Sequence, residues 1–83
     1  MTDDGSLDYP FTATKNGLWF LTFTGSTYLY VTTDTSEQYS ETMSNKNLSA
    51  TLIVPVVKGK TYSISEYEST LKIKNNKFFS FGN

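Results

Sequence analysis

Apolar and polar residues alternate along most of this chain, which is the pattern of β-strands that bury one face. In the first long segment of this kind, Trp19, Leu21 and Phe23 share one wholly apolar face, so we expect that face in the core. Leu18 and Phe20 fall on the opposite face. No window shows the period of an amphipathic helix, and the sequence therefore predicts an all-β domain.

Turn signals divide the chain into seven or eight short strands. The predicted strands span residues 9–13, 18–24, 27–32, 38–44, 49–57, 61–66, 68–74 and 77–81. We expect Gly25-Ser26 to close a hairpin between the second and third strands, and Asn75-Asn76 to form the last turn. The polar strand at 38–44 is expected at a sheet edge. Many short strands with regular turns predict a β-sandwich or barrel.

The longest apolar run, LIVPVV at 52–57, has enough apolar surface for both of its faces to be buried. Its two faces carry Leu52, Val54 and Val56, and Ile53, Pro55 and Val57. A small sandwich buries only one face of each strand, so we expect one set in the core and the other against a second copy of the chain. The pattern does not decide which set is which, and we take Ile53, Pro55 and Val57 as the candidate interface.

Length and composition also favour oligomerisation. A chain of 83 residues forms one domain, and a domain this small buries only ~60% of its unfolded surface. Disulfides and structural zinc commonly stabilise such domains, but the sequence has no Cys and no His. Association with another copy is the stabilising device that remains open.

The first eight residues are acidic and polar, and we expect a flexible arm or linker remnant there, followed by a single domain at 9–83. They lack the basic start and apolar middle of a signal peptide. No segment reaches the ~18 consecutive apolar residues of a membrane helix, so we expect no membrane insertion. With seven Lys, no Arg and eight acidic residues the net charge is −1, which does not favour nucleic-acid binding.

Residues with catalytic potential are few. Without Cys or His, Ser-His-Asp and Cys-His sites are excluded. Outside the first eight residues the carboxylates are Asp34, Glu37, Glu41, Glu66 and Glu68. They lie in polar segments or on outward faces, where a solvated surface explains them better than a catalytic pair. We therefore expect no catalytic residues and no enzymatic activity.

Cofactor and metal sites have no better support. The five glycines are dispersed and form no phosphate-binding loop, and the G-K-T triplet at 59–61 is better explained as a β-turn. Asp3, Asp4 and Asp8 could bind Ca²⁺ through their oxygens, but an acidic arm is the favoured interpretation. We expect no cofactor and no metal.

Tyrosine is abundant, and three tyrosines are candidate ligand contacts. Tyr28 and Tyr30 share the strand face opposite Leu29 and Val31, so one of these faces is exposed or meets a partner. An exposed aromatic ring packs on the apolar face of a sugar while nearby hydroxyl and amide groups meet its hydroxyls. Tyr28, Tyr30 and Tyr39 are therefore candidate glycan-binding residues. Burial in the core or in a subunit interface is the alternative for all three.

Three motifs carry a resemblance to a known family. They are YPFTATKNGLW at 9–19, LIVPVVKGKTY at 52–62, and the aromatic end of the chain with Phe78-Phe79. This pattern resembles the C-terminal head domains of phage tail fibres and related receptor-binding proteins. Those heads often carry Y-T-A-x-x-N/D-G early, V-P-V-x-K-G-D in the middle and F-F/Y in the last strand. Lys60 departs from the pattern, because an acidic residue is common at that position.

The resemblance implies an all-β, jelly-roll-like sandwich that forms a homotrimer, as in complement- and tumour necrosis factor-like proteins. It also implies a non-catalytic head at the tip of a virion fibre, acting outside the cell and attaching to a host-surface glycan or protein. A structural trimerisation, capping or capsid-decoration domain is one alternative, and a carbohydrate-binding module of a bacterial protein is another. The trimer rests on the resemblance alone, since the residues themselves argue only for a partner.

Overall fold

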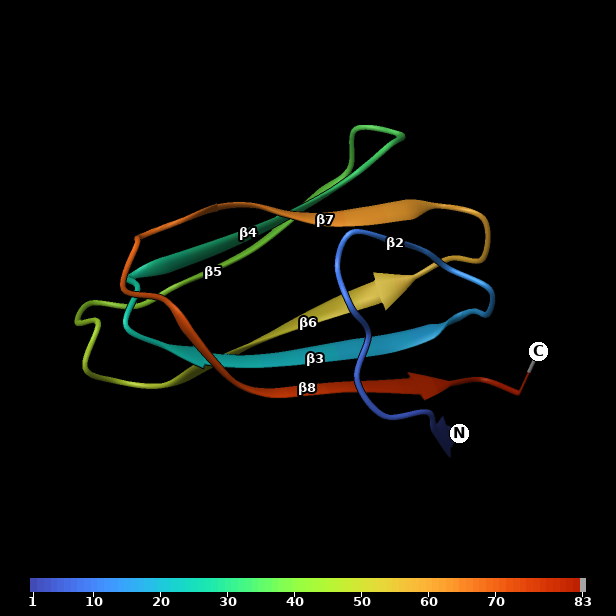
Figure 1. Ribbon diagram of the computed structural model, residues 1–83, viewed down its shortest axis with the longest axis horizontal. Coiled ribbons are helices and arrows are strands. Elements are labelled where there is room, and N and C mark those ends of the chain that lie inside the picture. Colours follow the sequence, from blue (N-terminus) through green and yellow to red (C-terminus); the bar gives the residue numbers. More distant parts are fainter. Residues whose placement is uncertain (83) are drawn as a thin grey trace.

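Every regular element in the described part of the chain is a β-strand. The computed structural model describes residues 1–82 (Figure 1). The strands are β1 (Thr2–Asp3), β2 (Phe11–Thr12), β3 (Gly17–Thr24), β4 (Tyr28–Thr33), β5 (Gln38–Thr42), β6 (Ala50–Val56), β7 (Thr61–Tyr67) and β8 (Lys72–Ser80). Over this range there is no helix that could cross a membrane.

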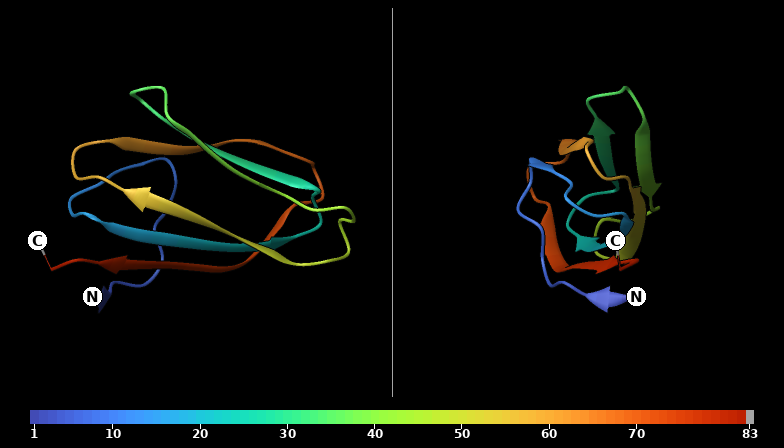
Figure 2. Two further views of the ribbon diagram at one scale, coloured as in Figure 1. Left: turned by 180° about the vertical axis from the view of Figure 1, so that it is seen from behind. Right: turned by 90° about the vertical axis from the view of Figure 1, so that its right-hand side faces the viewer.

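The strands form two antiparallel sheets of four strands each, which face each other across the core (Figures 1 and 2). The first sheet, here sheet A, has the order β1-β8-β3-β6, and the second, sheet B, has the order β2-β7-β4-β5. The first strand pairs with the last, the second with the seventh, the third with the sixth and the fourth with the fifth. This is a long antiparallel ribbon rolled into two sheets, the topology of a jelly roll. The predicted all-β sandwich of seven or eight strands is confirmed.

The predicted hairpin between the second and third strands is wrong. These strands are β3 and β4, which lie in opposite sheets, so the link at Gly25-Ser26 crosses from one sheet to the other. The Ser26 hydroxyl is buried, donates to the Tyr28 carbonyl (2.6 Å) and accepts the Glu68 backbone N–H (3.0 Å). The crossing is favoured because the apolar faces of β3 and β4 then bury each other, whereas a hairpin would leave both facing the same way.

The predicted turn at Asn75-Asn76 is also wrong. The segments 68–74 and 77–81, expected as two strands, are largely one strand, β8, and both asparagines lie inside it. The Asn76 side chain points into the sandwich opposite Leu21 and bonds to the Trp19 indole. Asparagine is a turn residue because its side chain competes for backbone hydrogen bonds, and here that side chain is engaged elsewhere.

The first eight residues, expected as a flexible arm, lie against the sandwich. Thr2 and Asp3 pair with the end of β8, and the backbone of Asp4 and Gly5 continues this contact with Phe78. The chain then passes over the open side between the two sheets to reach β2 (Figure 1). Hydrogen bonding along the free edge of β8 gives this segment an ordered path that its polar composition does not reveal.

The core takes one face of each long strand. Its buried apolar residues are Ala13, Trp19, Leu21, Phe23, Leu29, Val31, Leu52, Val54, Val56, Tyr62 and Phe78. The predicted inner face of β3 is thus confirmed. On β6 the structure decides what the pattern left open: the set containing Leu52 is buried, and the set containing Ile53 faces outward.

Candidate functional site

The outer face of sheet B carries a pair of tyrosines on its interior strand β4. The rings of Tyr28 and Tyr30 lie 5.7 Å apart between centroids, with their planes at 66°. Both tyrosine side chains are half-buried. Leu29 and Val31, which alternate with them along β4, are fully buried in the core. The aromatic edges and faces of the pair are therefore directed to the outside of the sandwich.

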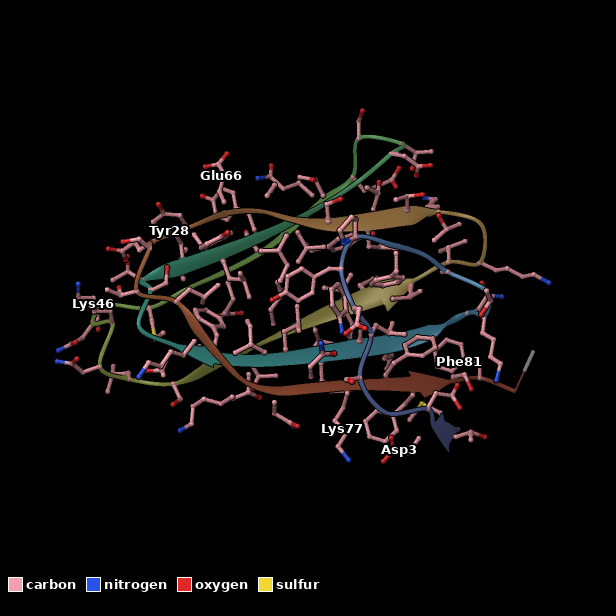
Figure 3. The ribbon with its side chains drawn as sticks, viewed as in Figure 1. Asp3, Tyr28, Lys46, Glu66, Lys77 and Phe81 are labelled. Atoms are coloured by element: carbon pink, nitrogen blue, oxygen red, sulfur yellow. The ribbon has the colours of Figure 1, made fainter. Side chains whose placement is uncertain are left out.

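Polar side chains surround this pair. The strand register places Ser40 and Thr42 of β5 opposite Tyr30 and Tyr28, and Glu66 of β7 opposite Tyr30 on the other side. Tyr28 and Glu66 lie on the same side of sheet B in Figure 3. We call these five residues the tyrosine face. No pocket was found in the described part of the chain, so this face is an open surface.

Tyr39, the third candidate ligand residue, does not join the pair. It lies opposite Val31 on β5 and packs against the core cluster from the inner side of the sheet. Tyr62 is fully buried, and Tyr67 is 49% exposed at the end of β7, opposite the inward-facing Leu29. The structure therefore brings two of the three predicted residues together.

The carboxylates expected to be solvated include two that organise loops. The Glu37 carboxylate accepts hydrogen bonds from Lys60 Nζ (2.7 Å) and from the hydroxyls of Thr33 and Thr35. These donors hold the pKa of Glu37 at about 2, with the Lys60 contribution the largest. The contact ties the β4–β5 turn to the β6–β7 turn.

Glu68 fixes the opposite end of sheet B. Its carboxylate accepts hydrogen bonds from the backbone N–H (2.6 Å) and the hydroxyl (2.7 Å) of Thr27, and these bonds lower the pKa of Glu68. Thr27 immediately precedes the tyrosine pair, so this contact holds the start of β4 against the end of β7. The two carboxylates thus support the ends of sheet B, and neither is paired with a second carboxylate.

The acidic N-terminal residues are used in ion pairs. Asp3 lies 3.1 Å from Lys77 Nζ and accepts the backbone N–H of Gly5, which lowers the pKa of Asp3. Asp4 lies 3.5 Å from Lys15 Nζ. Within residues 1–82 no three His, Cys, Asp or Glu side chains gather as a metal site would require.

The opposite surface of the molecule, the outer face of sheet A, is apolar at one end. Leu18 and Phe20 of β3 lie in register with Pro55 and Ile53 of β6, and Leu18 also lies opposite Phe79 of β8. The rings of Phe20 and Phe79 meet edge to face at 5.5 Å. We call these five residues the apolar face. Two of the three candidate interface residues belong to it.

The third candidate interface residue, Val57, lies just beyond the end of β6 and is 45% exposed. Sequence reasoning missed the rest of the apolar face. The alternation in β3 already placed Leu18 and Phe20 on the side opposite Trp19. What it could not supply was the register, which sets them beside Phe79 and Ile53 from distant parts of the chain.

Comparisons with protein-family models, with curated proteins and with solved structures found no match to this chain.

Proposed function

We propose that this protein is a non-catalytic binding module, the head of a phage tail fibre or a similar virion fibre, which attaches to a glycan on the host surface. The observation that supports this most directly is the Tyr28–Tyr30 pair on the outer face of sheet B. The tail-fibre context comes from the sequence resemblance, and the jelly-roll topology is compatible with it.

The chemistry of the tyrosine face suits a sugar. The apolar side of a pyranose ring stacks on one tyrosine ring, and the phenol hydroxyls remain available as donors and acceptors. Ser40 and Thr42 supply further hydroxyls on one side, and Glu66 supplies an acceptor on the other. Because the two rings are inclined at 66°, a single sugar stacks on one ring and contacts the edge of the other.

The open shape of the face sets the expected affinity. A surface without a pocket leaves much of a ligand in water, and each contact then contributes little. We expect weak binding of an extended glycan at a single site. Attachment to a host surface would then depend on several copies acting together.

Glycan-array screening followed by calorimetric titration of the best ligand tests the proposal. Tyr28→Ala and Tyr30→Ala should each weaken binding on the order of tenfold, in line with loss of one stacking partner. Tyr67→Ala is the matched control, since Tyr67 is an exposed tyrosine on the neighbouring strand but opposite the inward-facing Leu29. The proposal fails if no glycan binds, or if all three variants weaken binding equally.

The apolar face favours a second candidate, a purely structural domain that assembles a fibre or a capsid decoration. Such a domain would need the outer face of sheet A and would have no use for the tyrosine pair. Silence on the glycan array together with self-association of the chain would favour this candidate.

A further inference from the structure

The outer face of sheet B continues beyond the tyrosine face in polar, uncharged side chains. The next row along the strands places Thr32 of β4 between Gln38 of β5 and Ser63 of β7. At the β2 end of the sheet, the hydroxyls of Thr12 and Thr61 lie 2.8 Å apart. Hydroxyl and amide groups both donate and accept hydrogen bonds, as the hydroxyls of a sugar do. The face therefore offers hydrogen-bonding partners for a sugar well beyond the tyrosine pair.

Of the outward side chains on the strands of sheet B, within residues 1–82, only Glu66 is charged. None of the strands β2, β4, β5 and β7 contains a lysine, and the sequence has no Arg. The lysines lie on β8 of sheet A and in the connections between strands: Lys15, Lys46, Lys58, Lys60, Lys72, Lys74 and Lys77. In Figure 3, Tyr28 and Glu66 lie above the core, whereas Lys77 lies below it. The face is therefore weakly acidic and offers no cation to a ligand.

The Glu66 carboxylate is available to accept hydrogen bonds from a ligand. It is exposed and lies opposite Tyr30. The ion pairs within residues 1–82 use the carboxylates of Asp3, Asp4 and Glu37 and do not include Glu66. An ionised carboxylate accepts hydrogen bonds through both of its oxygens and donates none. Two neighbouring hydroxyls of a sugar ring supply such a pair of donors, whereas an acidic sugar brings a second negative charge and is repelled.

We propose that the ligand of this face is an uncharged, linear glycan that lies along β4, with two neighbouring hydroxyls of one sugar donating to Glu66. This inference rests on the proposed glycan binding and names the class of glycan. Acidic polymers, which carry carboxylates, phosphates or sulfates, are rejected because the face has no cation to replace their lost hydration. An uncharged sugar loses only the hydration of its hydroxyls, which the hydroxyl and amide groups of the face replace.

The direction of the glycan follows from the arrangement of the rows along β4. Outward side chains recur at every second position of a strand, so the rows of Tyr28, Tyr30 and Thr32 are ~6.8 Å apart and together span ~14 Å. This span is longer than one sugar ring. A sugar stacked on the tyrosine pair therefore places its linked neighbour over the row of Thr32, where the Gln38 side chain is exposed. Across the strands, by contrast, the face ends at β5, the last strand of sheet B.

A glycan array tests the class of ligand. It carries uncharged linear glycans from monosaccharide to hexasaccharide, together with uronic-acid oligosaccharides, each placed beside its carboxyl-reduced form. The two members of such a pair share linkage and length and differ only at the carboxylate. The expected result is binding of uncharged glycans, with an affinity that rises with chain length, and no binding of the acid forms. Calorimetric titration of the strongest uncharged oligosaccharide should give the same dissociation constant at low and at physiological salt, because no ion pair forms.

Three variants test the residues. Glu66→Gln keeps the size of the side chain but leaves one acceptor oxygen, so it should weaken binding of the uncharged oligosaccharide on the order of fivefold and admit the acid forms. Glu41→Gln is the matched control, because it removes the same charge from β5 at a position opposite the inward-facing Leu29, and it should change neither result. Gln38→Ala should weaken binding of the oligosaccharide and reduce the gain in affinity that each added sugar brings.

Two results would overturn the uncharged class and leave glycan binding intact, provided that Tyr28→Ala still weakens binding. One is an acid form that binds more tightly than its carboxyl-reduced partner. The other is equal weakening by Glu66→Gln and Glu41→Gln, in variants whose circular dichroism matches the parent. An affinity that is the same for a monosaccharide and a hexasaccharide would overturn the path along β4. If neither acidic nor uncharged glycans bind, this inference and the proposed function both fail.

Discussion

The indole N–H of Trp19 donates a 2.7 Å hydrogen bond to the side-chain oxygen of Asn76, across 57 positions of sequence. The same Asn76 oxygen accepts the backbone N–H of Leu7 (3.2 Å), and its amide nitrogen donates to the Leu7 carbonyl (2.9 Å). One side chain thus satisfies the largest core residue and holds the N-terminal segment over the open side of the sandwich. A buried indole N–H without such a partner carries a desolvation cost.

Replacing Asn76 by Ala should therefore destabilise the domain by about 2–3 kcal/mol, because it leaves the Trp19 N–H without its acceptor and releases Leu7. Urea unfolding followed by tryptophan fluorescence measures this change. Asn75→Ala is the control, since Asn75 is the exposed neighbour on the outer face and its loss should cost less than ~0.5 kcal/mol. Equal effects of the two variants would contradict the role assigned to Asn76.

Tyr62 makes the stability of the domain fall at alkaline pH. Burial of its phenol is the main reason that its pKa is raised above 10.0, and its hydroxyl meets the Val57 N–H. Because the folded state retains the proton that the unfolded state loses, stability is full below pH 10 and falls as pH rises through the raised pKa. Tyr62→Phe should remove this component of the alkaline loss, at a cost of about 1 kcal/mol at neutral pH. Unfolding curves at pH 7 and above pH 10 for both proteins provide the measurement.

Glu37 makes the stability of the domain fall at acidic pH, whereas Tyr62 makes it fall at alkaline pH. Its pKa is lowered from 4.5 to about 2, first by Lys60 and then by Thr35 and Thr33. The stabilisation is therefore present above pH 4.5 and is lost as pH falls toward 2. The stability difference between the parent and Glu37→Gln should shrink over this range, and high salt should reduce it at neutral pH. A carboxyl titration by NMR that finds an ordinary pKa for Glu37 would contradict the geometry.

Two glycines with positive φ allow the cost of backbone strain to be measured apart from the cost of close packing. Gly25 (φ +80°) and Gly59 (φ +94°) both favour glycine, but a Cβ on Gly25 would lie 2.1 Å from the Thr70 carbonyl oxygen, whereas a Cβ on Gly59 meets open space. Gly59→Ala should cost about 1–2 kcal/mol, from the left-handed conformation alone. Gly25→Ala should cost clearly more, because the sheet-to-sheet crossing has to open. Similar losses in thermal unfolding would show that the approach to Thr70 is relaxed at little cost.

Which residues share a face of a strand follows from the sequence, because side chains alternate strictly along a strand. The inner face of Trp19, Leu21 and Phe23, the partition of Ile53 from Leu52, and the polar edge strand β5 all agree with the structure. These are local properties, and neighbouring residues are sufficient to define them.

The candidate site was only partly predictable, because neighbouring residues define the faces of a strand but not its register with other strands. Alternation placed Tyr28 and Tyr30 together, because they are two residues apart on one strand. It could not place Tyr39 relative to them, since that required the register between β4 and β5, in which Tyr39 lies opposite the inward Val31. The contact of the Glu68 carboxylate with Thr27 could not be predicted either, because the two residues are 41 positions apart.

The sequence by itself determined that this protein is an all-β domain, which residues of each strand share a face, and that β6 has an apolar face left over. Only the tertiary structure decided that β3 and β4 lie in opposite sheets, that Asn76 reaches Trp19, and that Ile53 lies beside Phe20 and in one apolar surface with Phe79. The physical reason is the range of the interactions. Burial and alternation act on each strand alone, whereas strand order and register depend on hydrogen bonds and packing between segments that are distant in sequence.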